Sequence, residues 1–164
     1  MTERSSRMRA AHSSRHLARV FALLGLYQWL ADPEQDYAAI EAHLAGLIED
    51  EGEQIEGCDI RPSDFASCDR AFFRTLLSGV LDRMTEIEPL VAKTVDRDLS
   101  RVSLVERAVL FIGAFELLAC PETPWRVILN ESVELAKEFG SGYRFTNAVL
   151  EKIAHEVRPA ETAE

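Results

Sequence analysis

The sequence predicts an all-α protein of about seven short helices packed around one central apolar helix. Two observations support this: apolar residues recur at three- and four-residue steps along most of the chain, and no stretch alternates apolar and polar residues long enough to form a convincing strand. The 164 residues suit one domain, or two small subdomains that share a core. Folding at this size buries about 70% of the unfolded chain's surface, so stability requires neither a disulfide nor a metal ion.

The first half of the chain is expected to hold three helices. The first begins near Ser13 and ends at Asp32-Pro33, a pair suited to the N-cap and first position of the next helix. The third runs from about Asp69 to Arg83. Residues 32–60 hold ten acidic residues and no Lys or Arg, and Glu49 to Asp64 reads as a long acidic loop. The apolar positions expected inside are Leu17, Val20, Leu24 and Tyr27, then Ile40, Leu44, Leu47 and Ile48, then Phe72, Phe73, Leu76, Leu77 and Val80.

The second half is expected to hold four more helices. Pro89 marks a break, or a first-turn position, near the start of the fourth helix. Ser103 and Glu106 form an S-x-x-E capping box that opens the fifth. This fifth helix is apolar almost all round as far as Leu118, so we expect it to be the central buried element. The sixth runs from Thr123-Pro124 to Gly140, and the seventh carries Phe145, Val149, Leu150 and Ile153 and fades before Pro159.

Charge is distributed unevenly along the chain. Five arginines against the single acidic residue Glu3 give the first 20 residues a net charge of +4, so the remainder carries −14 of the total of −10. A basic end on an acidic body is typical of proteins whose one end meets a polyanion, although many N-termini are merely basic and disordered. Residues 1–12 lack apolar periodicity and are predicted to be a disordered basic arm. Arg15 and Arg19 lie one turn apart and are expected on one exposed face.

The three cysteines and the N-terminal segment indicate the cellular compartment of the protein. Cys58, Cys68 and Cys120 are odd in number and include no C-x-x-C pair, which favours a reducing compartment over a disulfide framework or a zinc site. The apolar run at residues 20–26 follows a basic start as in a signal peptide, but it is soon interrupted and lacks a clean cleavage site. It is also too short to span a membrane. We therefore expect a cytoplasmic protein that is not embedded in a membrane.

No catalytic constellation is recognisable in the sequence. It contains no Gly-rich phosphate loop, no G-x-S-x-G and no H-E-x-x-H. His12 and His16 lie four residues apart, but no third metal ligand is near them. Glu116, inside the apolar fifth helix, suits a general acid less well than a buried carboxylate held by an arginine or a backbone N–H. The sequence thus predicts no enzyme, no metal site and no cofactor.

Three runs in the second half are more specific than helical periodicity requires. Residues 105–118 (VERAVLFIGAFELL) look like a known fifth-helix signature, 129–140 (LNESVELAKEFG) are similar to I-N-E-x-V-E-L-A-K-x-[FY], and 144–150 (RFTNAVL) resemble K-F-V-N-G-V-L. Residues 22–29 and 73–80 fit the first and third helices of the same family. The family that the chain resembles, over roughly residues 13–157, is NusB, the bacterial transcription antitermination factors.

The resemblance implies a particular fold and function. The fold would be two small helical bundles packed together in one domain, 13–157, with subdomains of about 13–83 and 84–157 and a tail at 158–164. The function would be binding of boxA-type single-stranded RNA jointly with NusE, a small-subunit ribosomal protein, in an antitermination complex on RNA polymerase during ribosomal RNA transcription. The matching RNA-contact positions are Arg15, His16, Arg19, Arg144 and Phe145, and the matching partner-contact positions are Tyr27 and Glu106.

Physical chemistry supports part of this assignment and keeps an alternative open. Arginines on one helical face can hold phosphates and stack on unpaired bases. An aromatic residue at core spacing, such as Phe145, is more often a packing residue than a base-stacking one, and the same holds for Tyr27. The alternative function is an acidic helical protein-interaction adaptor with little RNA affinity of its own, which the −14 body favours.

Overall fold

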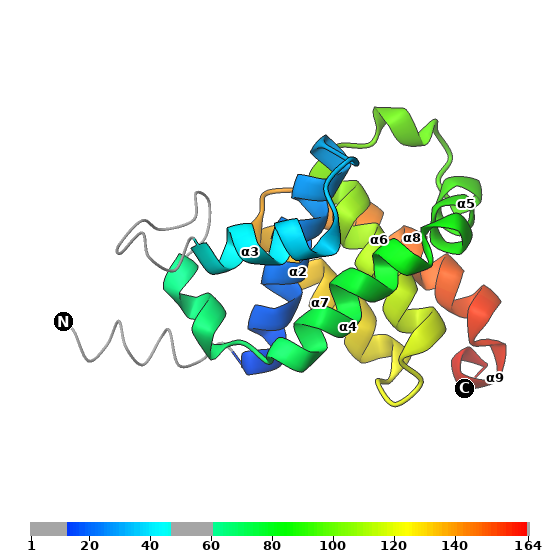
Figure 1. The fold of residues 1–164 in the computed structure, drawn as a ribbon. Helices are drawn as coiled ribbons and strands as arrows, with labels where there is room; N and C mark the ends of the chain where they lie inside the picture. The colour runs from blue at the N-terminus through cyan, green and yellow to red at the C-terminus, as the bar shows by residue number, and fades with distance from the viewer. Residues whose placement is uncertain (1–12, 47–60, 164) are drawn as a thin grey trace.

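Helices form all the regular secondary structure in residues 13–46 and 61–163, the part of the chain that this computed structural model describes (Figure 1). The absence of strands from these residues confirms the all-α prediction. The predicted basic arm at 1–12 and most of the predicted acidic loop lie outside them. The α-helices are α2 (Ser14–Ala31), α3 (Tyr37–Gly46), α4 (Arg70–Asp82), α5 (Met84–Thr94), α6 (Leu104–Ala119), α7 (Trp125–Glu138), α8 (Tyr143–Val157) and α9 (Pro159–Thr162), with short 3-10 helices at Pro62–Ser67 and Leu99–Arg101.

Capping residues fix three of the helix starts. The side chains of Ser13, Asp69 and Ser103 accept hydrogen bonds from backbone N–H groups three residues on, at 3.0, 3.0 and 3.2 Å, and so begin α2, α4 and α6. After the C-terminal end of α7, Gly140 adopts a left-handed backbone conformation with φ of 69°. This conformation is suited to glycine, and it ends α7 where the sequence predicts.

Pro89 lies inside α5 and neither breaks nor begins it, so the expectation for this residue is wrong. Proline removes only one backbone hydrogen bond, and here it sits on the exposed side of the helix. The opposite side is held by the buried residues Ile87, Leu90 and Val91. Packing of this apolar side therefore outweighs the local cost of the proline.

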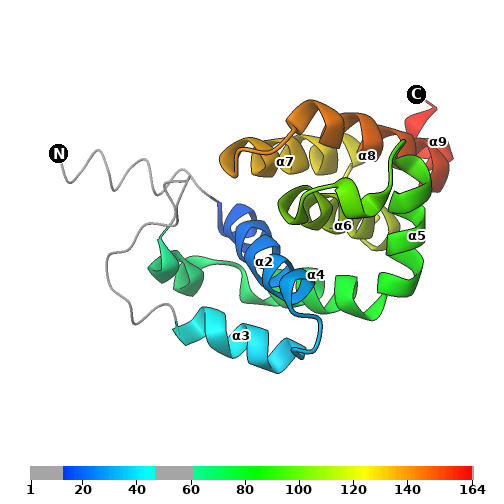
Figure 2. The same ribbon diagram turned by 90° about the horizontal axis from the view of Figure 1, so that it is seen from above.

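The helices form two groups that meet at α6. In the first group, α3 and α4 pack on α2; in the second, α6, α7 and α8 pack on one another, with α5 and α9 at the far end (Figure 2). Helix α6 also contacts α2 and α4, and its residues from Ala108 to Leu117 are all buried. The predicted central helix is thus confirmed, and one continuous apolar core joins the two groups.

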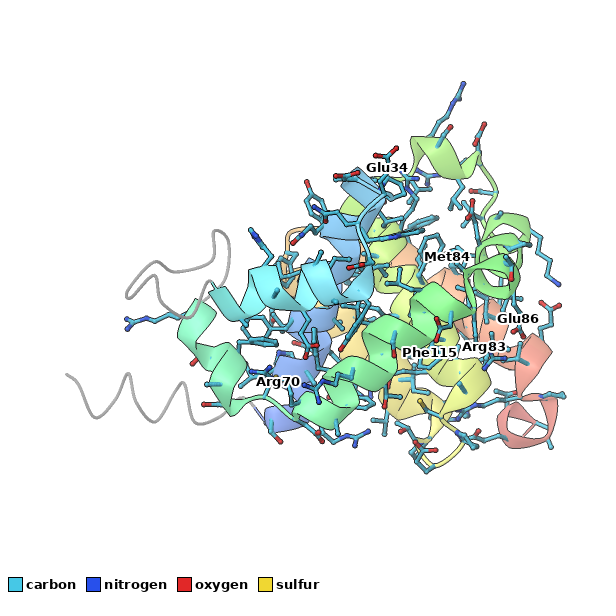
Figure 3. All side chains as sticks on the ribbon, viewed as in Figure 1. Glu34, Arg70, Arg83, Met84, Glu86 and Phe115 are labelled. Carbon is cyan, nitrogen blue, oxygen red and sulfur yellow. The ribbon has the colours of Figure 1, made fainter. Side chains whose placement is uncertain are left out.

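The approach of α4 to α6 is close enough to require a glycine. Phe115 projects from α6 towards α4 (Figure 3), and a Cβ atom on Gly79 would lie 2.3 Å from its ring.

Side chains at the start of α5 are visible in the same view. There Arg83 donates to Glu86 at 2.8 Å, across one turn of the exposed surface.

The segment expected as a tail contains α9 and packs on the end of α6. Arg158 is buried, and its guanidinium donates to the backbone carbonyls of Leu117, Thr123, Glu116 and Cys120 at 2.8, 2.6, 3.0 and 2.7 Å. The last carbonyls of a helix have no partner within it, so Arg158 supplies the donor that Leu117 of α6 lacks. The carbonyl of Glu116 also accepts from the N–H of Cys120. Glu161 completes the arrangement by accepting from Arg158 and from the N–H that begins α7.

Candidate nucleic-acid interface

The first turns of α2 carry Arg15, His16 and Arg19, the expected RNA-contact residues of this helix. Arg15 is exposed, His16 is half-buried and Arg19 is only 4% exposed. The expectation that Arg15 and Arg19 share an exposed face is therefore wrong for Arg19. The reason is that nearly every residue of α2 from Leu17 to Leu26 is buried, so this part of the helix has no exposed face for Arg19 to occupy.

Arg19 is engaged by a carboxylate from the central helix. Its Nε and Nη2 atoms donate to the two oxygens of Glu116 at 3.1 and 2.8 Å, and Glu116 is 1% exposed. This bidentate pair is the arrangement in which a guanidinium and a carboxylate satisfy each other best. The structure confirms Glu116 as a buried carboxylate held by an arginine, and it assigns Arg19 to joining the two helix groups.

His16 lies between two carboxylates of α7. Its Nε2 is 2.9 Å from Glu138 and its Nδ1 is 3.3 Å from Glu131. Hydrogen bonds to Glu131 and Glu138 raise the pKa of His16 from 6.5 to about 9, so the ring is charged at neutral pH. The same hydrogen bond from His16 lowers the pKa of Glu131. Glu131 and Glu138 are seven residues apart, which is about two helical turns, so both face α2.

Arg15 remains at the surface beside an aromatic ring. Its guanidinium carbon lies 3.8 Å from the ring centre of Phe72, at the start of α4. Such stacking orients the guanidinium plane and leaves its edge available to an anion. Of the three expected residues in α2, Arg15 is therefore the one placed to contact a phosphate directly.

The start of α8 places Arg144 and Phe145 differently. Arg144 is exposed, whereas Phe145 is half-buried and packs against the core, with the guanidinium of Arg97 4.6 Å from its ring centre. The exposed aromatic residue at this end is Tyr143, which is 37% exposed. Its ring centre lies 4.9 Å from Nζ of Lys137 and 5.7 Å from the guanidinium carbon of Arg144. We call these three residues the Tyr143 platform.

The two expected partner-contact residues have different surroundings. Tyr27 is 43% exposed on α2, so the expectation from its spacing that it lies inside is wrong. Glu106 is half-buried at the start of α6, and its Oε1 accepts from the backbone N–H of Gly142 at 3.1 Å. Only the Ser103 half of the predicted capping box is found, in which Ser103 accepts from the N–H of Glu106. The Glu106 carboxylate instead ties the start of α6 to the residue that precedes α8. The expected partner-contact and RNA-contact positions adjoin there.

The described residues contain no group of His, Cys, Asp and Glu side chains arranged to hold a metal ion. Both cysteines among them, Cys68 and Cys120, are buried thiols, and burial raises the pKa of Cys120 to about 11. A thiol so rarely ionised at neutral pH is a poor nucleophile. No helix in the same residues is long and apolar enough to cross a membrane.

Sequence reasoning missed Tyr143, Glu131 and Glu138. Tyr143 occupies the first position of α8, outside the three- and four-residue spacing that links Phe145 to Val149, and this position was a signal that it is exposed. No local signal identifies the two glutamates, since their partner His16 lies more than 100 residues away in the sequence.

The fold defines an all-helical protein whose two helix groups share one central helix. The NusB family model matches residues 16–155. The chain is 43% identical over 150 residues to the transcription antitermination protein NusB of Thiobacillus denitrificans, covering 90% of this chain and 92% of the relative. It is 39% identical over 168 residues to that of Ralstonia pickettii, covering 99% and 98%. The chain belongs to the NusB family, whose members are transcription antitermination factors.

A solved structure supports the fold independently. The structure of T. maritima NusB superposes with a TM-score of 0.69 at 22% sequence identity, over 92% of this chain and 97% of that one. The shared arrangement of helices therefore extends over almost the whole of both proteins.

Proposed function

We propose that this antitermination factor binds boxA-type single-stranded RNA together with NusE, as part of the antitermination complex on RNA polymerase in ribosomal RNA transcription. The observation that carries the RNA-binding part is the Tyr143 platform, an exposed ring with two cations close to it. Unpaired bases stack on exposed aromatic rings, and neighbouring cations hold the phosphates on either side.

Arg15 extends this surface. The first turn of α2 contacts the last turn of α7 through His16 and Glu138, and α8 begins a few residues further on (Figure 2). Arg15 and the Tyr143 platform therefore lie on the same side of the molecule. One strand of RNA passing over this side would meet Tyr143 as a stacking surface and Arg15, Lys137 and Arg144 as phosphate contacts.

The position of Glu106 supports joint binding with a protein partner. Because Glu106 contacts Gly142, a partner docked on Glu106 would lie beside RNA bound at the start of α8. A basic ribosomal protein would also offset the net charge of −10, which repels RNA. Phe145 is proposed to pack beneath the Tyr143 platform and so support it. The complex of this chain with NusE and RNA is proposed to form in the cytoplasm.

One observation favours the alternative, an adaptor with little RNA affinity. Three carboxylates, Glu116, Glu131 and Glu138, lie against His16 and Arg19 and neutralise the start of α2. The basic surface that the described residues form at the start of α2 is therefore small, and on this alternative the partner decides whether RNA binds with useful affinity.

The test is the affinity for boxA-type RNA at fixed salt, measured with and without saturating NusE. Joint binding predicts coupling of about 5- to 150-fold, with RNA tightening the protein contact by the same factor. Glu106→Lys is expected to weaken the partner contact, and circular dichroism establishes that the variant is folded. Equal RNA affinities with and without NusE would contradict joint binding and favour the adaptor function.

A further inference from the structure

The charges around the first turns of α2 cancel. His16 and Arg19 contact the carboxylates Glu116, Glu131 and Glu138, whereas Arg15 lies over the ring of Phe72. Among the described residues, the three cations at the start of α2 are therefore matched by three carboxylates. Two of the three carboxylates come from α7, more than 100 residues away.

The two α7 carboxylates differ from Glu116 in what they hold. Glu116 is bound to a buried arginine that RNA cannot reach, so this pair is structural. Glu131 and Glu138 hold His16 near the surface, with their own side chains 32% and 20% exposed. Each accepts one N–H of the imidazolium ring. A phosphate oxygen is the same kind of acceptor and would use the same two N–H groups.

We propose that Glu131 and Glu138 form an internal clamp on His16 that competes with RNA phosphate and so limits the affinity of this chain for RNA. The proposal rests on the proposed function, because it concerns the regulation of the same surface. RNA must displace at least one carboxylate before His16 can contribute a phosphate contact. A partner that neutralises or moves Glu138 would open the clamp and raise RNA affinity without touching the RNA.

Glu138 is the weaker end of the clamp. Its Oε1 accepts from His16, whereas its Oε2 is buried and has no hydrogen-bond partner among the described residues. A buried acceptor without a donor raises the free energy of this arrangement, so releasing Glu138 to solvent recovers part of the cost of breaking its contact with His16. Glu131 has a second cation nearby, since Nη1 of Arg19 lies 3.8 Å from its Oε2. We therefore expect the clamp to open at Glu138.

The test compares Glu138→Gln with Glu88→Gln in direct titrations with boxA-type RNA. Glu88 is exposed on α5, at the opposite end of the molecule, so its variant removes the same single charge without touching His16 (Figure 2). The clamp predicts that Glu138→Gln binds RNA about five-fold more tightly, the factor for one pair of charges about 4 Å apart in water. It also predicts a salt dependence steeper by about 0.7, which corresponds to one further phosphate contact, whereas Glu88→Gln stays within about two-fold of the wild type.

The outcomes separate the clamp from the function on which it rests. Wild-type binding with no gain in Glu138→Gln over Glu88→Gln would overturn the clamp alone. No binding by the wild type or either variant, even with NusE present, would overturn the proposed function as well. The wild-type protein gives a second readout if Glu138→Gln does not fold: saturating RNA should shift the ring resonances of His16 in an NMR titration, and unchanged resonances would also overturn the clamp.

Discussion

Replacing Arg19 by Met is expected to destabilise the protein by about 3–5 kcal/mol. Arg19 and Glu116 are 4% and 1% exposed and share two hydrogen bonds, so removing the guanidinium leaves a carboxylate buried without its partner. Breaking one partner of a buried pair has a cost of this size, because the remaining charge keeps its desolvation penalty. Urea unfolding followed by circular dichroism at 222 nm measures the change.

The pair formed by Arg74 and Glu41 provides a matched control. Arg74 donates to Glu41 at 2.9 Å, about the same distance, but its side chain is 57% exposed. Arg74→Met is therefore expected to cost much less stability than Arg19→Met, because water screens an exposed pair. Equal losses in Arg19→Met and Arg74→Met would refute the reasoning from burial.

The double variant Arg19→Met, Glu116→Leu distinguishes the stability lost through an unpaired charge from the stability lost through altered packing. Replacing both charges by apolar side chains removes the unpaired carboxylate, so most of the stability lost in Arg19→Met should return. The same unfolding assay measures this recovery. If the double variant were as unstable as the single one, the loss would come from altered packing and not from an unpaired charge.

Three further predictions concern stability. The pKa of His16 is raised from 6.5 to about 9, so the charged ring's contribution to the free energy of unfolding is complete below pH 6.5 and is lost as the pH rises through about 9. Screening near the surface limits this contribution to about 1–2 kcal/mol. The difference in unfolding free energy between the wild type and His16→Gln, measured across pH 6–10, should show that loss. Arg158→Met should cost about 3 kcal/mol in urea unfolding, because the carbonyls of Leu117 and Thr123 lose their donor and those of Glu116 and Cys120 keep only a backbone N–H. Arg158→Lys should recover less than half of this loss. Gly79→Ala should cost about 1–3 kcal/mol, because the new methyl group overlaps the ring of Phe115, and a thermal midpoint equal to that of the wild type would contradict this.

Local signals in the sequence were sufficient for the helices and their starts. Helices begin directly after Ser13, Asp69 and Ser103, where the sequence predicts their starts, and the helix that is apolar all round is the central one. Side-chain and backbone preferences act over one or two turns, so a single sequence contains them. Asp32-Pro33 and Pro89 are the exceptions. Asp32 is the C-cap of α2 and not the N-cap of the next helix, because α3 begins only at Tyr37, where Asp36 accepts from the N–H of Ala39. Packing of the apolar side of α5 overrides the local preference of Pro89.

Arg19 shows where spacing alone was insufficient. Its four-residue separation from Arg15 indicated a shared face, but the surrounding residues from Leu17 to Leu26 are apolar nearly all round. Arg19 in one apolar helix and Glu116 in another are each expensive to bury alone, and together they satisfy each other. Two lone, opposite charges in two apolar helices are therefore a signal of a buried ion pair that the sequence does contain.

The surface contacts required the tertiary structure. His16 meets Glu131 and Glu138 only because α2 packs on α7, and no periodicity specifies which side chains then become neighbours. The resemblance to the family directed attention to Phe145, whereas the exposed ring at the start of α8 belongs to Tyr143. Which aromatic residue is exposed depends on where α6 and the segment carrying Arg97 cover α8.

The most direct measurement of the central claim is the affinity of the full chain for boxA-type single-stranded RNA, with NusE present, for Tyr143→Ala and Tyr27→Ala. The two tyrosines are 37% and 43% exposed, so both substitutions remove a similar exposed ring. The account predicts that Tyr143→Ala loses about 1–3 kcal/mol of RNA binding, the usual loss of one base-stacking contact. With NusE at saturation, Tyr27→Ala should bind RNA as the wild type does. Equal RNA affinities for Tyr143→Ala and the wild type would contradict the claim that RNA binds at the start of α8.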